Sequence, residues 1–150
     1  MSILYRIANG KDAEELKRLN DEFNGEGSNT VENIREGLER KDAETVFVAE
    51  SDHMLLGFCC GQLLKSICYS VFYVEITELY VTDSYRKLGI GRNLVSYAEE
   101  WYRKQDIHDF QLFTGKENTD AQKFYERIGY RRHEDVLYRK RDRWKEHPCE

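Results

Sequence analysis

Apolar and polar residues alternate in patterns that predict a strand and two helices at the start of the chain. Residues 3–8 alternate as a half-buried strand does. Asp12, three residues before Glu15 in a capping-box pattern, begins a helix whose apolar positions recur at helical spacing as far as Phe23. Thr30 is placed to cap a second helix, because the apolar residues after it share one helical face.

Apolar runs rich in β-branched residues follow, and they favour strands. Residues 45–50 and 54–64 flank a short turn, which predicts an antiparallel hairpin. A connecting segment then leads into a central strand that begins near Phe72 and ends at about Val81.

The C-terminal half alternates helices with strands. A helix is expected over about residues 89–103 and a strand over residues 107–114. A short helix with Gly129 as its C-cap comes next, and residues 130–140 predict one or two closing strands. The resulting order, βααβββαβαβ with an optional last strand, indicates an α/β fold in which a mixed sheet has helices on both faces.

The length and composition predict one domain. A chain of 150 residues can bury a substantial core. It contains one proline and no low-complexity tract that would mark a linker. We therefore expect a single domain over residues 1–150, with a basic tail from about residue 141.

Charge and cysteine usage argue against several classes of function. The net charge of −5 disfavours nucleic acid as a partner and suits a cationic substrate. The longest uncharged apolar run, residues 54–61, falls short of the roughly 18 residues that a membrane helix needs. The four cysteines and four histidines show neither zinc spacing nor a disulfide framework. The expected protein is soluble, unprocessed and cytoplasmic, with no metal and no membrane partner.

The central strand runs into a basic glycine turn that opens a helix. The turn reads Arg86-Lys87-Leu88-Gly89-Ile90-Gly91. Unpaired N–H groups at a helix start attract anions, so the turn predicts a pyrophosphate cradle. Leu94 stands where a dinucleotide-binding fingerprint has its third glycine, and no Gly-Lys-Ser/Thr triplet occurs. Rossmann and Walker loops are therefore not supported.

Two blocks of the sequence resemble the motifs of one family. Leu79-Tyr80-Val81, followed by Arg86-x-x-Gly89-x-Gly91, is similar to motif A of the GNAT superfamily of acyl-CoA-dependent N-acyltransferases. Residues 118–130 resemble its motif B, which begins with Asn and contains Tyr-Glu-x-x-Gly. Two motifs in the right order are more specific than either alone. The resemblance extends to about Arg141 and implies a splayed sheet and acetyl-CoA as cosubstrate.

The resemblance assigns roles within a cofactor site. The CoA pyrophosphate would be bound by the backbone N–H groups of Leu88, Gly89, Ile90, Gly91 and Arg92. The side chains of Arg86 and Lys87 would add positive charge. The exposed backbone of Leu79 and Val81 would pair with pantetheine, and one N–H there would polarise the thioester carbonyl. Asn118 would bond the pantetheine arm, although Asn at a helix start is often only a cap. Tyr125 would be the general acid for the leaving thiolate.

The general base stays open between two carboxylates. Glu75 and Glu78 are three apart on the central strand and should point to opposite faces, unless a bulge lies between them. Members of the superfamily place a carboxylate at either position. The sequence therefore does not choose between them.

An acidic segment between the first two helices is the candidate acceptor region. Glu22 and Glu26, with Asp21, lie between the first two helices, a region that commonly lines the acceptor pocket in this superfamily. The expected function is acetyl transfer from acetyl-CoA to a primary amine by direct attack in a ternary complex. The acceptor would be a cationic small molecule resembling an aminoglycoside or polyamine. A peptide or protein acceptor, a non-catalytic acyl-CoA-binding module, another acyl group and a homodimer through a strand near Val136 remain alternatives.

Overall fold

The computed structural model describes residues 1–40 and 44–142 and contains a five-stranded mixed sheet. The strands, in spatial as well as chain order, are β1 (Leu4–Ile7), β2 (Glu44–Ser51), β3 (Met54–Leu64), β4 (Tyr73–Val81) and β5 (Asp109–Leu112). The first four pair antiparallel, and β5 pairs parallel with β4. The predicted mixed α/β sheet is thereby confirmed.

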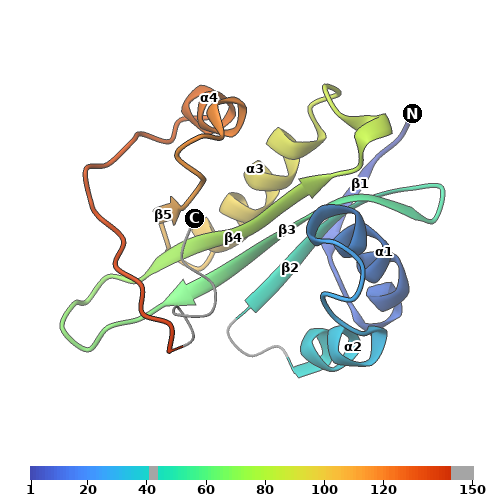
Figure 1. Ribbon diagram of the computed structural model, residues 1–150, viewed down its shortest axis with the longest axis horizontal. Coiled ribbons are helices and arrows are strands. Elements are labelled where there is room, and N and C mark those ends of the chain that lie inside the picture. The colour runs from blue at the N-terminus through green and yellow to red at the C-terminus, as the bar shows by residue number, and fades with distance from the viewer. Residues whose placement is uncertain (41–43, 143–150) are drawn as a thin grey trace. The chain divides into compact units, whose positions relative to one another are not determined.

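Helices cover both faces of this sheet (Figure 1). They are α1 (Ala13–Asn24), α2 (Val31–Arg40) and α3 (Ile90–Arg103), with short 3-10 turns at Gly10–Asp12 and Asp83–Tyr85. Alternate strand residues face opposite layers: Cys59 packs with α3, whereas Cys60 packs with the layer of α1 and α2. Each face of the sheet therefore has its own apolar core.

The chain separates into two compact units, Met1–Gly115 and Lys116–Glu150. The sheet, α1, α2 and α3 belong to the first unit, and α4 (Thr119–Arg127) belongs to the second. Of the predicted basic tail, residues 143–150 lie outside the described residues. The expectation of a single domain stays a prediction.

The start of α1 differs from the predicted capping box. Asp12 is the N-cap residue of α1, but its side chain makes no cap bond there. The capping box belongs instead to the preceding 3-10 turn: the side chain of Asn9 accepts from the N–H of Lys11, while the Asp12 carboxylate accepts from the N–H of Asn9. Asp12 also accepts two bonds of 2.8 Å from Arg6 on β1. Glu15 is bound to Arg18 and to the N–H of Leu55. Asp12 and Glu15 thus bond α1 to the strands. The spacing of the two residues in the sequence is the same whether they make these contacts or a capping box.

The hairpin and the second helix follow the prediction. Asp52 and His53, between β2 and β3, have φ of 50° and 63°, as a two-residue turn with matching strand twist requires. The Thr30 hydroxyl accepts from the N–H of Asn33 at the start of α2. In β3, a Cβ on Gly57 would lie 2.6 Å from the carbonyl oxygen of Tyr80, so only glycine allows β4 to approach there.

The predicted closing strands are absent from the described residues of the second unit. Residues 130–142 follow α4 without regular structure, and nearly all of their side chains are exposed. Charged residues and a histidine fill positions 131–135, so the segment lacks the alternation that would give a strand one apolar face. Gly129 does end α4 as predicted, with φ of 107° and a bond from the N–H of Tyr130 to the carbonyl of Tyr125.

Candidate active site

A β-bulge in the central strand brings both candidate bases to the same face of the sheet. Glu78 lies opposite Cys60 and Ile76 lies opposite Gly61, so Thr77 is an extra residue on β4. Glu75 lies opposite Gln62, two residues from Cys60 on a regular strand. Because cross-strand partners share a face, Glu75 and Glu78 both lie on the side of α1 and α2.

The two carboxylates have different surroundings. The Oε1 of Glu75 accepts a bond of 3.1 Å from the side-chain amide of Gln111 on β5. Burial, together with the negative charge of Glu44 on β2, raises the pKa of Glu78 above its ordinary value. A carboxylate with a raised pKa is the better proton acceptor, which distinguishes Glu78 chemically from an ordinary surface glutamate.

Beyond the bulge, β4 extends past the end of its parallel neighbour, β5. Pairing with β5 covers Tyr73 to Ile76 and ends there. The N–H of Thr82 donates to Leu56 on β3, so by alternation along the strand Leu79 and Val81 direct their backbone groups to the other side. No described strand pairs with that side of β4 past Ile76. The edge of β4 is thus open beyond the last residue of β5, Leu112, and an extended ligand could pair with it.

The glycine turn carries the chain from β4 into α3. Lys87 and Gly89 both have positive φ, 62° and 82°, and Gly89 is the N-cap of α3. Gly91 lies in the first helical turn and is not among the positive-φ glycines. A Cβ on Gly89 would meet nothing within 4 Å, so at Gly89 the backbone conformation, not space within the chain, favours glycine. The turn presents the free N–H groups and positive dipole end of α3 to solvent, as an anion site requires.

Arg86 is fixed at the base of this turn. Its Nε donates to the carbonyl oxygen of Val81 at 2.8 Å, and its guanidinium pairs with Asp83 at 2.7 Å. The guanidinium also lies 5.4 Å from the centre of the Tyr80 ring. About half of the Arg86 side chain remains exposed, so its charge still reaches the solvent beside the turn.

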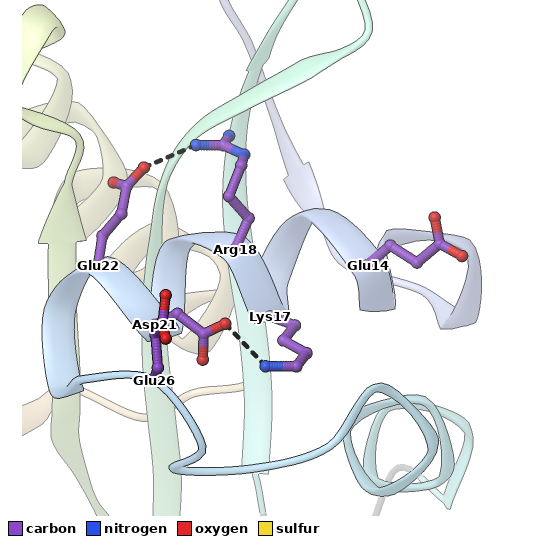
Figure 2. Close-up of a pocket in the computed structure, with 6 residues that line it drawn as sticks. All are labelled: Glu14, Lys17, Arg18, Asp21, Glu22 and Glu26. Carbon is purple, nitrogen blue, oxygen red and sulfur yellow. Dashed lines mark hydrogen bonds and ion pairs between the residues drawn. The ribbon is translucent and has the colours of Figure 1, made fainter.

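An acidic hollow lies along α1 and the loop after it. Figure 2 shows the residues that line it: Glu14, Lys17, Arg18, Asp21, Glu22 and Glu26. Lys17 pairs with Asp21 at 2.7 Å, and Arg18 pairs with Glu22 at 2.9 Å. Four carboxylates therefore meet two cations, and the hollow has a net negative charge. Both predicted acceptor residues, Glu22 and Glu26, belong to it.

Glu22 makes further contacts that the sequence did not indicate. Its Oε2 accepts from the hydroxyl of Tyr80 and from the hydroxyl of Thr82, both at 2.9 Å. These partners are about 60 residues away, so neither periodicity nor a local motif could have found them. Tyr80 lies near the end of β4, and Thr82 follows the last strand residue, Val81, just before the 3-10 turn that leads to the glycine turn.

The remaining predicted residues lie in the second unit. Asn118 caps α4, with its side chain accepting from the N–H of Ala121 at 3.2 Å. Tyr125 is half-buried, and its ring makes edge contacts with Phe124 and Tyr130. Their predicted roles toward acetyl-CoA stay predictions.

The strand cysteines are unsuited to nucleophilic catalysis. Cys59 and Cys60 are buried, and burial, with the charge of Glu99, raises the pKa of Cys59 to about 12. Burial raises the pKa of Cys60 as well. A thiol with so high a pKa supplies almost no thiolate near neutral pH. The arrangement therefore gives no support to a covalent acyl-cysteine intermediate on either residue.

Iodoacetamide is expected to alkylate the exposed Cys68 and to leave Cys59 and Cys60 unmodified in the folded protein at about pH 8. Mass spectrometry of the peptides would measure the labelling, with urea-unfolded protein as the control in which all three react. Rapid labelling of Cys59 or Cys60 in the folded protein, with parallel loss of acetyl transfer, would contradict this assignment.

Two further features of the described residues bear on other functions. No group of three or more His, Cys, Asp and Glu side chains in residues 1–40 and 44–142 could hold a metal ion. Across the same part of the chain, none of the helices combines the length and the apolar character needed to cross a bilayer.

Comparison with known proteins gives consistent matches. The profile of the Acetyltransferase (GNAT) family matches residues 13–130. An uncharacterised N-acetyltransferase of Methanocaldococcus jannaschii is 32% identical over 100 residues, which are 66% of this chain but only 44% of that protein. Aminoglycoside N(6′)-acetyltransferase type 1 of Salmonella typhimurium is 27% identical over 99 residues, 63% of this chain and 68% of that protein. The structure of AAC(6′)-Iy in complex with the bisubstrate analogue CoA-S-monomethyl-acetylneamine has a TM-score of 0.81 at 22% identity, covering 94% of this chain and 99% of the other.

Proposed function

Because this chain belongs to the Acetyltransferase (GNAT) family, we propose that it transfers the acetyl group of acetyl-CoA directly to a primary amine of a cationic small molecule. One observation carries the proposal: the path of β4 into α3. The strand bulges at Thr77, extends past its parallel neighbour after Ile76, and continues into a positive-φ glycine turn at a helix N-terminus. An open strand edge for an extended arm and an anion site for a pyrophosphate thus follow one another along the chain.

The cofactor would lie along this path. The N–H groups of Leu88 to Arg92 would bind the pyrophosphate, with Arg86 and Lys87 supplying positive charge. The pantetheine arm would pair with the backbone of Leu79 and with the N–H of Val81, whose carbonyl oxygen already accepts from Arg86. An N–H of this edge would donate to the thioester carbonyl oxygen and stabilise the negative charge that develops there.

The transfer itself needs three proton movements. The protonated amine loses a proton to the Glu78 carboxylate, directly or through a water, and the neutral nitrogen attacks the thioester carbon. The carbon–sulfur bond then breaks, and the sulfur takes a proton from the Tyr125 hydroxyl. The second proton that the nitrogen loses as the amide forms returns to the Tyr125 oxygen. We assign the base to Glu78 because its pKa is raised, whereas Glu75 is bound to Gln111. Asn118 would contact the pantetheine arm in addition to capping α4.

A cationic acceptor is favoured by charge. The chain carries a net charge of −5, and the hollow along α1 brings four carboxylates together with two cations. Glu26 lies outside the two ion pairs of the hollow and is the residue there that we propose to contact an ammonium group. A relative that acetylates aminoglycosides supports the same class of acceptor.

A thiol-release screen with acetyl-CoA would test this proposal. The panel comprises aminoglycosides, polyamines, amino acids and short peptides, and the expected result is CoA release with molecules that carry several amines. Release with peptides alone would select the peptide or protein acceptor. Tight CoA binding without release by any member of the panel would indicate a binding module.

Replacing Tyr125 with phenylalanine is expected to lower kcat by about ten- to a hundredfold with little change in the Kd for CoA. This loss is at or below the lower limit of the range typical of general acids, because a thiol with a pKa near 8.5 is already a fair leaving group. Steady-state kinetics on an acceptor from the screen would measure the effect, with Tyr130→Phe as the control on the same unit. An unchanged kcat in Tyr125→Phe would remove the acid role.

A further inference from the structure

We propose that Glu22 is a positioning residue that holds the phosphate-binding turn in place from the end of α1. This inference rests on the proposed function, since it assigns the turn to the CoA pyrophosphate. In this role Glu22 positions the turn and does not contact the acceptor directly. The role follows from the hydrogen-bond partners of its two carboxylate oxygens.

Both oxygens of Glu22 are bound within the chain. Oε1 accepts from Arg18, one turn earlier on α1, at 2.9 Å. Oε2 accepts from the hydroxyls of Tyr80 and Thr82 at 2.9 Å each. Arg18 is itself held by Glu15 and by the carbonyl of Leu55 on β3. The carboxylate therefore connects the last turn of α1 with the end of β4.

The position of these partners explains the effect on the turn. Thr82 is the N-cap of the 3-10 turn at Asp83–Tyr85, and the glycine turn begins with the next residue, Arg86. Tyr80 precedes Thr82 by two residues on β4, so both side chains fix the point where the chain leaves the sheet. Hydrogen bonds to an ionised acceptor are about twice as strong as neutral ones, which suits a bond that must hold a turn.

An aromatic layer strengthens the same connection. Phe23, next to Glu22 on α1, stacks on Tyr80 with the ring centres 5.0 Å apart and the planes inclined by 23°. The guanidinium of Arg86 also lies over the Tyr80 ring. Glu22 orients the Tyr80 hydroxyl, and the Tyr80 ring in turn contacts the first residue of the glycine turn. A shift of Tyr80 would therefore be transmitted to Arg86.

The expected consequence is selective for the phosphate end of the cofactor. N–H groups bind a pyrophosphate well only when their geometry is held closely, so a turn with more freedom binds it less tightly. Pantetheine, which lacks the pyrophosphate, does not use the turn. Loss of Glu22 should thus weaken binding of CoA and leave binding of pantetheine unchanged.

Three variants test the inference: Glu22→Ala, Glu22→Gln and the control Glu36→Gln. Glu36 is an exposed carboxylate on α2, so its change matches the charge lost at Glu22. Glu22→Ala is expected to raise the Kd for CoA about tenfold, as loss of a charged hydrogen bond does. Glu22→Gln keeps an oxygen that can accept from Tyr80 and Thr82, so it should recover part of this loss. Calorimetry would measure CoA, and an NMR titration would measure pantetheine.

Amide hydrogen exchange supplies a readout without any ligand. The N–H groups of residues 83–89 should exchange faster in Glu22→Ala than in the wild type or Glu36→Gln. Unchanged exchange there would overturn the inference. Because this readout needs no ligand, it holds even if the wild type fails to bind CoA and the proposed function is wrong. Equal losses of CoA and pantetheine affinity would also overturn it, because they would mean a general distortion.

Discussion

Replacing Glu78 with glutamine is expected to lower kcat with acetyl-CoA by about 10²- to 10⁴-fold, the range typical of a lost general base. Glutamine matches the shape of glutamate but cannot take the proton that the ammonium group of the acceptor must lose before its nitrogen can attack. The Kd for CoA should stay the same, because the proposed phosphate contacts lie beyond Val81. Steady-state kinetics on an acceptor from the screen, with calorimetry for CoA, would measure the two quantities.

The pH dependence of the wild type follows from the raised pKa of Glu78. The base acts only when ionised, so kcat/KM should fall as the pH drops through that pKa. The fall should begin at a higher pH than an ordinary glutamate would give. Glu44→Gln removes a nearby negative charge and should move the fall of kcat/KM to lower pH. An acid limb that stays in place in Glu44→Gln would contradict the contribution of Glu44.

Glu75→Gln is the matched comparison for Glu78→Gln, since both residues lie on β4 and on the same face. Only the change at Glu78 should abolish most of the turnover; a larger loss in Glu75→Gln would reverse the assignment. The loss should not come from unfolding. A carboxyl whose pKa is raised in the folded state stabilises the fold only at low pH, and this contribution is lost as the pH rises through the raised pKa. At neutral pH, Glu78→Gln should therefore unfold at the same temperature as the wild type or higher.

The bulge in β4 could not be predicted from the local sequence pattern, although the strand itself could. Strand periodicity alone would place Glu75 and Glu78 on opposite faces, and the single extra residue, Thr77, reverses that result. Its hydroxyl bonds the carbonyl of Cys60, which no feature of the β4 sequence reveals. The strand, the glycine turn and the helix after it were predictable because each has a local signature.

Contacts between segments far apart in the chain have no local sequence signature and could not be predicted. The bonds from Glu22 to Tyr80 and Thr82 depend on where α1 crosses the sheet, which packing decides. The sequence shows that residues 21–26 are acidic, but it does not show which residues their carboxylates bond. One or two closing strands were predicted over residues 130–140, but most of these residues are charged and leave no apolar face.

Replacing Gly89 with aspartate is expected to raise the Kd for CoA by about a hundredfold. Two effects combine in this variant. Gly89 has φ of 82°, and a side chain there is strained by about 1 kcal/mol, less for Asn and Asp than for other residues. The added carboxylate would also lie beside the proposed pyrophosphate, where repulsion between charges near a protein surface reaches a few kcal/mol. Isothermal titration calorimetry would measure the Kd.

Gly89→Asn separates these two effects because asparagine has nearly the same shape and the same tolerance of positive φ. A Cβ at this position meets nothing within 4 Å, so neither variant should clash within the chain. Gly89→Asn should therefore weaken CoA binding only slightly, and the difference between the two variants should shrink at high salt, which screens the added charge. Equal affinities for CoA in Gly89→Asp and the wild type would mean that no phosphate group binds at this helix N-terminus. The cofactor would then have to bind elsewhere, and the proposed path from β4 into α3 would lose its anion site.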